Sequence, residues 1–193
     1  MTNDRHFAEL VSVACHDILT PLATVYGFAR TLETLPLEDP APRYLEMIAA
    51  ASAQIDELVD QLRLVARIES GKYEPSLVEC DSLDLAREAA ARLEEGRLDV
   101  KGEGAPVRVD AEAITRALSQ LARATARFGG HESVDLEVRG AELLLSPLSR
   151  SARPVVLGEE PRELAAPAAA LLVRALGGEL EAREDALVVR LPA

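Results

Sequence analysis

One histidine stands among residue types that together can handle a phosphoryl group. The stretch reads Cys15-His16-Asp17-Ile18-Leu19-Thr20-Pro21-Leu22. A neutral imidazole is a good nucleophile near pH 7 and could hold a phosphoryl group as a phosphoramidate. The adjacent carboxylate of Asp17 could accept a proton or a hydrogen bond from the ring, although neighbouring residues on a helix point about 100° apart. His16 is therefore the candidate phosphoacceptor, and Asp17 the candidate orienting group or general base.

A proline follows this histidine within the same predicted helix. Inside a helix, Pro21 removes a hydrogen-bond donor and crowds the carbonyl group of Asp17, which costs about 3 kcal/mol or more. A helix that keeps such a residue needs a reason, and His16 is the nearest candidate. Thr20 lies one turn after His16 on the same face, where its hydroxyl could simply bond back to the carbonyl group of His16.

Two apolar stripes position this site. Apolar residues recur in steps of three and four over residues 4–35, at Val11, Ala14, Ile18, Leu22, Val25, Ala29 and Leu32. After Pro36 and Pro40, a second stripe begins near Pro42 and runs through Leu45, Ile48, Ser52, Ile55, Val59, Leu62 and Ala66 to a stop at Gly71. This spacing predicts a helical hairpin. Because two helices bury too little apolar surface alone, we expect two copies to form a four-helix bundle; a plain coiled-coil dimeriser is the alternative.

The remainder of the chain predicts a small α/β unit. Helices are expected over residues 84–93, 110–128 and 164–176, and strands over residues 107–109, 134–138, 142–145, 180–183 and 187–191. The fold class is therefore α+β. Residues 1–75 are predicted to form the hairpin domain, and residues 76–193 a small α/β sandwich domain.

Composition excludes several classes of partner. The chain has 193 residues and a net charge of −12, which argues against nucleic acid, because such binding depends on Lys and Arg. Cys15 and Cys80 lie far apart and predict neither a disulfide framework nor a metal site. Without a signal-peptide pattern or an apolar run of about 18 residues, we expect a cytoplasmic protein with no membrane partner. His6 and His131 are expected to be surface residues without a role.

The stretch around His16 resembles the phosphoacceptor box of sensor histidine kinases, H-E/D-x-x-T/N-P. The resemblance continues from Leu22 to Leu32 as P-L-x-x-I-x-G-Y/F-x-x-x-L, returns from Arg67 to Lys72, and covers about residues 5–90. It implies the same dimeric bundle, and it implies that Thr20 could position water to hydrolyse a phosphorylated receiver. Leu19 departs from the family, which commonly has a basic or polar residue there.

An exposed leucine at position 19 would be a contact for a docking protein, or it could be a slightly rotated core residue. We count Leu22 and Tyr26 with Leu19 as candidate docking residues.

Residues 76–193 resemble the ATP-binding domain of histidine kinases, but the motifs that bind ATP are missing. The second Asn of N-x-x-x-N-A-x-K-Y, a Mg²⁺ ligand in the family, corresponds to Ala124. The adenine-binding D-x-G-x-G is replaced by Ser-Pro-Leu-Ser-Arg at 146–150, and the phosphate-binding G-x-G-L by Glu-Leu-Ala-Ala at 163–166. Only about 18 residues remain for an ATP lid, which is too few. We therefore expect no ATP, no other cofactor and no metal in this chain.

Together these observations predict a dimeric histidine phosphotransferase of a two-component phosphorelay. His16 would take a phosphoryl group from the aspartate of one response-regulator receiver domain, or of a hybrid histidine kinase, and pass it to another. Mg²⁺ would belong to the receiver. Three alternatives stay open: a regulator or scaffold that carries no phosphoryl group, a sensor kinase with a divergent nucleotide pocket, and a receiver phosphatase that depends on Thr20.

Overall fold

The computed structural model describes the backbone of residues 2–34 and 41–192, and the side chains of these ranges except those of residues 2–12, 15, 33 and 34. The expected surface position of His6, the side chain of Cys15 and the loop at residues 36–40 lie outside the described residues. By its contacts the chain divides into two compact units, Met1–Arg63 and Leu64–Ala193.

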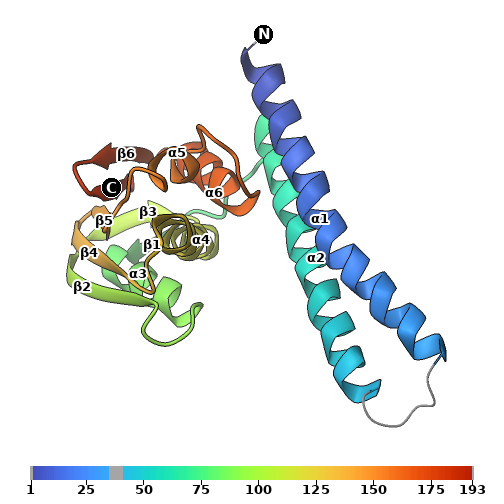
Figure 1. Ribbon diagram of the computed structural model, residues 1–193. Coiled ribbons are helices and arrows are strands. Elements are labelled where there is room, and N and C mark those ends of the chain that lie inside the picture. Colours follow the sequence, from blue (N-terminus) through green and yellow to red (C-terminus); the bar gives the residue numbers. More distant parts are fainter. Residues whose placement is uncertain (1, 35–40, 193) are drawn as a thin grey trace. The chain divides into compact units, whose positions relative to one another are not determined.

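The first unit is the predicted helical hairpin. Helix α1 (Thr2–Thr34) and helix α2 (Ala41–Glu69) run side by side (Figure 1), and the rings of Phe28 and Tyr44 stack with centroids 5.0 Å apart. Helix α2 ends as predicted at Gly71, whose φ of +67° suits glycine. The amide groups of Gly71 and Lys72 donate to the carbonyl groups of Ile68 and Arg67 at 3.0 and 2.8 Å.

The buried face of α2 is shifted by one residue from the predicted apolar stripe. In a single chain the buried residues of this helix are Ala41, Ala51, Leu58, Gln61 and Val65. Ile48, Ile55 and Leu62 of the predicted stripe are only half-buried, and Leu45 is 57 % exposed. The predicted stripe therefore lies along the edge of the contact within one chain.

The second unit consists of one five-stranded sheet, a small two-stranded sheet and four helices (Figure 1). Strands β2 (Leu98–Gly104), β4 (Val134–Gly140), β5 (Glu142–Ser146), β7 (Ala186–Arg190) and β6 (Glu179–Arg183) form the larger sheet in that order. Strands β1 (Val78–Asp81) and β3 (Pro106–Val109) pair antiparallel. The helices are α3 (Ser82–Ala91), α4 (Ala111–Gly129), α5 (Arg153–Val156) and α6 (Ala165–Ala175).

Alternation along the strands gives the sheet one apolar face. In β4, Val134, Leu136 and Val138 are buried, whereas the residues between them are at least partly exposed. Helices α3, α4 and α6 contact the sheet and enclose the core of the unit. Leu64 and Ile68, at the end of α2, also pack against this core, which explains why the division of contacts falls within that helix. The domain boundary predicted at residue 75 stays a prediction.

The predicted helices and strands of this unit are present, but three elements were missed. Strand β2 has two glycines and three charged residues among its seven, and strand β1 is short and largely exposed. Helix α5 has one turn and follows a stretch without apolar periodicity. The predicted helix at 84–93 starts two residues earlier, because Asp81 is its N-cap and accepts hydrogen bonds from the amides of Leu83 and Asp84.

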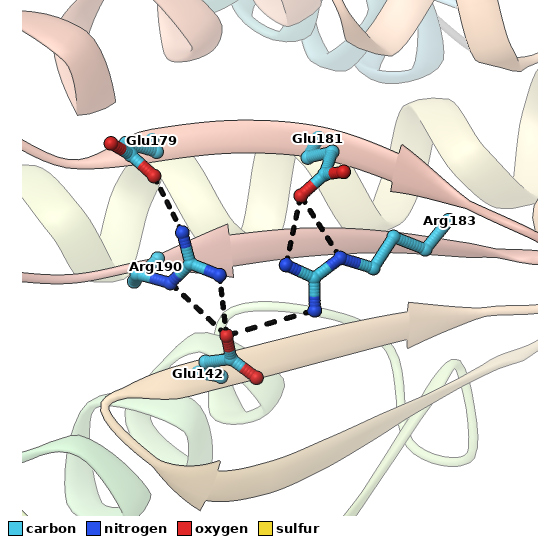
Figure 2. A network of polar contacts seen from close by, with 5 residues as sticks. All are labelled: Glu142, Glu179, Glu181, Arg183 and Arg190. Atoms are coloured by element: carbon cyan, nitrogen blue, oxygen red, sulfur yellow. Dashed lines mark hydrogen bonds and ion pairs between the residues drawn. The ribbon is translucent and has the colours of Figure 1, made fainter.

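A network of ion pairs ties three strands together on the other face of the sheet (Figure 2). Arg190 in β7 lies between Glu142 in β5 and Glu179 in β6, its direct partners in the strand register. Its Nε and Nη2 donate to Glu142 Oε1 at 3.0 and 2.6 Å, and its Nη1 to Glu179 Oε2 at 2.6 Å. Arg183 bonds Glu181 at 2.9 Å and approaches Glu142 to 3.7 Å. These pairs link β5, β7 and β6 across the strands.

The hydrogen bonds from Arg190 hold the pKa of Glu142 below its usual range, and the charges of Arg183 and Arg139 add to the effect. A carboxylate with a lowered pKa in the folded state stabilises the fold above its unfolded-state pKa, and this contribution is lost as the pH falls through the folded-state pKa. We therefore predict that Glu142→Gln is less stable than the wild type at pH 7. The difference should shrink as the pH falls below the ordinary pKa of glutamate, in urea unfolding measured from neutral to acid pH.

Glu103→Gln is the matched control, because Glu103 lies in strand β2 of the same sheet and forms no ion pair among the described side chains. Its stability difference from the wild type should not depend on pH in this way. A Glu142→Gln difference that is constant from neutral to acid pH would contradict the role of the network.

Among the helices that the structure describes, none combines the length and apolar character needed to cross a membrane.

Candidate functional site

The candidate phosphoacceptor lies on the open surface of α1. The side chain of His16 is 83 % exposed, and its Nδ1 lies 3.4 Å from Asp17 Oδ1. An ionised carboxylate can only accept a hydrogen bond, so this contact suits the neutral imidazole tautomer with its proton on Nδ1. Nε2 then carries the free lone pair. The contact predicted between these neighbours is thus present in the structure, and it leaves a nucleophilic nitrogen on an accessible ring.

Helix α1 continues through Pro21, which is buried. The proline cannot donate a hydrogen bond to the carbonyl group of Asp17, one turn earlier. In the adjacent turns, Thr20 Oγ1 donates to the carbonyl oxygen of His16 and Thr24 Oγ1 to that of Thr20, each at 3.3 Å. The hydroxyl of Thr20 therefore bonds back as the sequence suggested. Its role in positioning water stays a prediction.

The three candidate docking residues follow His16 along α1. Leu19, Leu22 and Tyr26 are 61 %, 46 % and 66 % exposed in a single chain. They are spaced three and four residues apart and therefore share a side of the helix. Leu22 was also counted in the apolar stripe, so its exposure shows that one chain alone does not cover this stripe.

In the second unit, the positions that replace the ATP-binding motifs take part in packing. Ala124 is completely buried within α4, and Gln120, at the position of the first Asn, is also buried. Glu163, at the first position of the phosphate-binding motif, forms an ion pair with Arg127 Nη1 at 3.0 Å. These side chains, at the positions predicted to correspond to the nucleotide motifs, pack within the second unit or pair with it.

The short segment after β5 also packs onto α4. Ser151 Oγ donates to the carbonyl group of Phe128 at 2.7 Å, and Ser149 Oγ accepts a hydrogen bond from the amide of Ala152 at 3.1 Å. Helix α5 follows, with Val155 and Val156 completely buried, and it contacts both α4 and α6. Helices α4 and α6 also contact each other directly. The segment that would form an ATP lid is thus part of the core.

The sequence assigned no role to His131, but the structure places it in a distinctive environment. The residue is half-buried, its Nε2 is buried without a hydrogen-bond partner, and it borders a cavity of about 470 Å³ at the end of α4. No sequence signal identifies this cavity, because its residues come from separate elements. Within the described ranges, no group of three His, Cys, Asp or Glu residues is arranged to hold a metal ion.

The comparisons with known proteins agree with this geometry. Residues 8–71 match the family model of the His Kinase A (phospho-acceptor) domain. No curated protein is similar enough to the sequence to count as a match. Among solved structures, the histidine kinase AdeS of Acinetobacter baumannii is 15 % identical with a TM-score of 0.69, over 92 % of this chain and 97 % of that chain.

Two further solved structures are similar to the chain. Full-length ShkA, solved in complex with AMPPNP, is 21 % identical with a TM-score of 0.53, and the match covers 96 % of this chain but only 45 % of ShkA. A bacterial phosphotransferase is 18 % identical with a TM-score of 0.48, over 96 % of this chain and 94 % of that chain. At these identities, AdeS and ShkA establish the fold of the chain: a phosphoacceptor hairpin followed by a domain with the kinase ATP-binding fold.

Proposed function

We propose that this chain, a histidine-kinase-like protein of two-component signalling, is a histidine phosphotransferase that relays phosphoryl groups between receiver domains without using ATP. The observation that carries the proposal is a contrast between the two units. The first presents an exposed imidazole with a free Nε2. In the second, side chains of the protein itself occupy the positions at which the family binds nucleotide.

The chemistry requires only the residues of this site and a phosphorylated receiver. The lone pair of His16 Nε2 attacks the phosphorus of an aspartyl phosphate, an N–P bond forms, and the P–O bond to the receiver carboxylate breaks. The receiver aspartate leaves as a carboxylate. The ring becomes positively charged while Nδ1 keeps its proton, and Asp17, at 3.4 Å, stabilises that charge or takes the proton. The reverse reaction transfers the group to a second receiver, and Mg²⁺ acts on the receiver side.

Three features of the second unit support independence from ATP. Mg²⁺ requires oxygen ligands, and the methyl group of Ala124 offers none. Glu163 adds a negative charge where the family approaches phosphate with glycine backbone. Helix α5 and the buried Val155 and Val156 pack where a mobile lid would be needed. A phosphoryl donor other than ATP is therefore the simplest source for His16.

The exposed apolar residues of the hairpin support pairing with a second copy and docking of a receiver. Leu45 on α2 is 57 % exposed, and Leu22 on α1 is 46 % exposed. Both belong to the predicted stripes, so a four-helix bundle of two chains would cover them. Leu19 and Tyr26, the two most exposed of the three candidate docking residues, form the proposed receiver contact. The second unit would add docking surface, and a cytoplasmic location stays a prediction.

The relay is tested by replacing the phosphoacceptor. A receiver domain labelled on its aspartate should transfer label to the wild-type protein and through it to a second receiver. His16→Gln should reduce both transfers to background, because glutamine has no nucleophilic ring nitrogen. Labelled protein on gels under alkaline conditions, where phosphohistidine survives, is the measurement.

His131→Gln is the matched control, because it removes a histidine of the second unit and should leave transfer unchanged. If output of the signalling pathway is the same with His16→Gln as with the wild type, the chain acts instead as a scaffold that carries no phosphoryl group.

Independence from ATP has its own test. Incubation with γ-labelled ATP and Mg²⁺ should give no label on the protein, and the same mixture should not raise its thermal midpoint, because a ligand that does not bind the native state cannot stabilise it. An active sensor kinase serves as the positive control. Label on the wild type that is lost in His16→Gln would show that the chain is a kinase with a divergent pocket.

A further inference from the structure

A cavity of about 470 Å³ lies beside α4, between the C-terminal half of this helix and the segment that connects α3 to β2. Its floor consists of Leu93, Ala122 and Ala126, and its rim carries the charged and polar side chains of Glu94, Arg97, Arg123, Arg127, His131 and Glu132. All of these residues belong to the second unit. The residues at 146–150 and 163–166, which replace the nucleotide motifs, do not line it.

The cavity arises from residue size and helix geometry. Ala122 and Ala126 are one turn apart, and each contributes only a methyl group to the surface of α4. Arg123 and Arg127 form the adjacent column on the same helix, and both are exposed. The α3–β2 segment forms the opposite wall, where Arg97 Nη1 donates to the carbonyl group of Glu132 at 3.1 Å. The cavity therefore has a small apolar floor, which lies between rows of longer charged side chains.

The three arginines on the rim differ in whether they form ion pairs. Arg97 Nε and Nη2 donate to Glu94 Oε2 at 3.1 and 3.0 Å, so these two charges compensate each other. Arg127 is paired with Glu163 through Nη1 and lies over the ring of Phe128, 5.4 Å from its centroid. Arg123, in contrast, has no ion pair or hydrogen bond among the described side chains. Its guanidinium group is available to a ligand.

His131 supplies a second unused polar group at the same cavity. Its Nε2 is buried and unpartnered, and the ring lies close to Gly129, where a β-carbon would come within 2.6 Å of the ring carbon Cδ2. Glycine at position 129 therefore leaves the space that the imidazole occupies. A buried polar atom without a partner is costly and uncommon in folded proteins, so the position of this ring calls for an explanation beyond packing.

We propose that this cavity binds a small organic anion, with its carboxylate or phosphate group on Arg123 and its apolar body on the floor of Leu93, Ala122 and Ala126. The planar guanidinium group matches both anions through paired N–H donors. The volume is within the range of small-molecule sites. Arg97 and Arg127 are paired with Glu94 and Glu163, so Arg123 is the arginine at this cavity for which the described side chains supply no partner. This site is independent of the proposed relay at His16.

The test is a titration of the full chain with benzoate and with phenyl phosphate, followed by calorimetry and by ¹⁵N-edited NMR of the backbone. Saturable binding of at least one anion is expected, with shifts confined to residues around 93–97 and 122–132. Benzamide, which is neutral and has the same ring, should bind much more weakly. The stronger of the two anions assigns the ligand group as a carboxylate or as a phosphate ester.

Two variants distinguish the contribution of the Arg123 charge to binding from that of the cavity shape. Arg123→Gln should weaken binding by at least about tenfold, since it removes a charge-assisted contact while the exposed position tolerates the change. Ala126→Leu should also abolish binding, because the larger side chain fills the floor and leaves every charge in place. Arg116→Gln is the matched control: it is exposed on the same helix, two turns earlier, and does not line the cavity.

Absence of saturable binding by both anions would overturn the proposal. So would equal binding of benzamide, or binding that Arg123→Gln leaves unchanged.

Discussion

The direct packing of α4 against α6 and α5 is the constraint on which the account of this protein depends. Alanine makes this packing possible, because Ala124 on α4 and Ala166, Ala169 and Ala170 on α6 are at most 1 % exposed. Small side chains let helices approach one another closely. In the family that the fold resembles, a nucleotide is held by polar residues of the helix that corresponds to α4. Here Ala124 of α4 belongs to the apolar core.

The packing of the second unit bears on the source of the phosphoryl group for His16 in the first unit. A phosphoacceptor histidine needs a phosphoryl donor, and under the proposed function that donor is a phosphorylated receiver and not ATP. The hairpin presents an exposed His16 ring, a carboxylate 3.4 Å from its Nδ1, and a helix that continues through Pro21. A protein with these two properties fits the middle of a relay, where phosphoryl groups arrive from and depart to aspartates.

The sequence predicted the hairpin well because its periodicity is long and its stop signal is strong. Gly71 has the left-handed backbone that a helix end requires, and the contact of His16 with Asp17 follows from adjacency on one helix. Strand β2 escaped prediction because it lies at the edge of the sheet and its apolar alternation stops after Val100, where two glycines and two charged residues follow. Helix α5 has a single turn, which is too short for a periodic pattern.

Tertiary contacts decided the remaining features. Arg97, Arg123 and His131 are brought to one cavity by the way in which α4 lies beside the α3–β2 segment, and nothing in their spacing along the chain indicates this. In the same way, the one-position shift of the buried face of α2 depends on how the two helices meet. Local patterns thus predicted the helix and neighbours of His16, whereas the cavity beside α4 could be found only from the fold.

The measurement that tests the central claim most directly is ³¹P NMR of the chain after it has been charged by a phosphorylated receiver in the absence of ATP. The account predicts one phosphohistidine signal, with the phosphoryl group on Nε2, because Asp17 keeps the proton on Nδ1. The signal should be missing in His16→Gln. A protein that stays unphosphorylated in the presence of receivers but gains this signal from Mg·ATP would contradict the account.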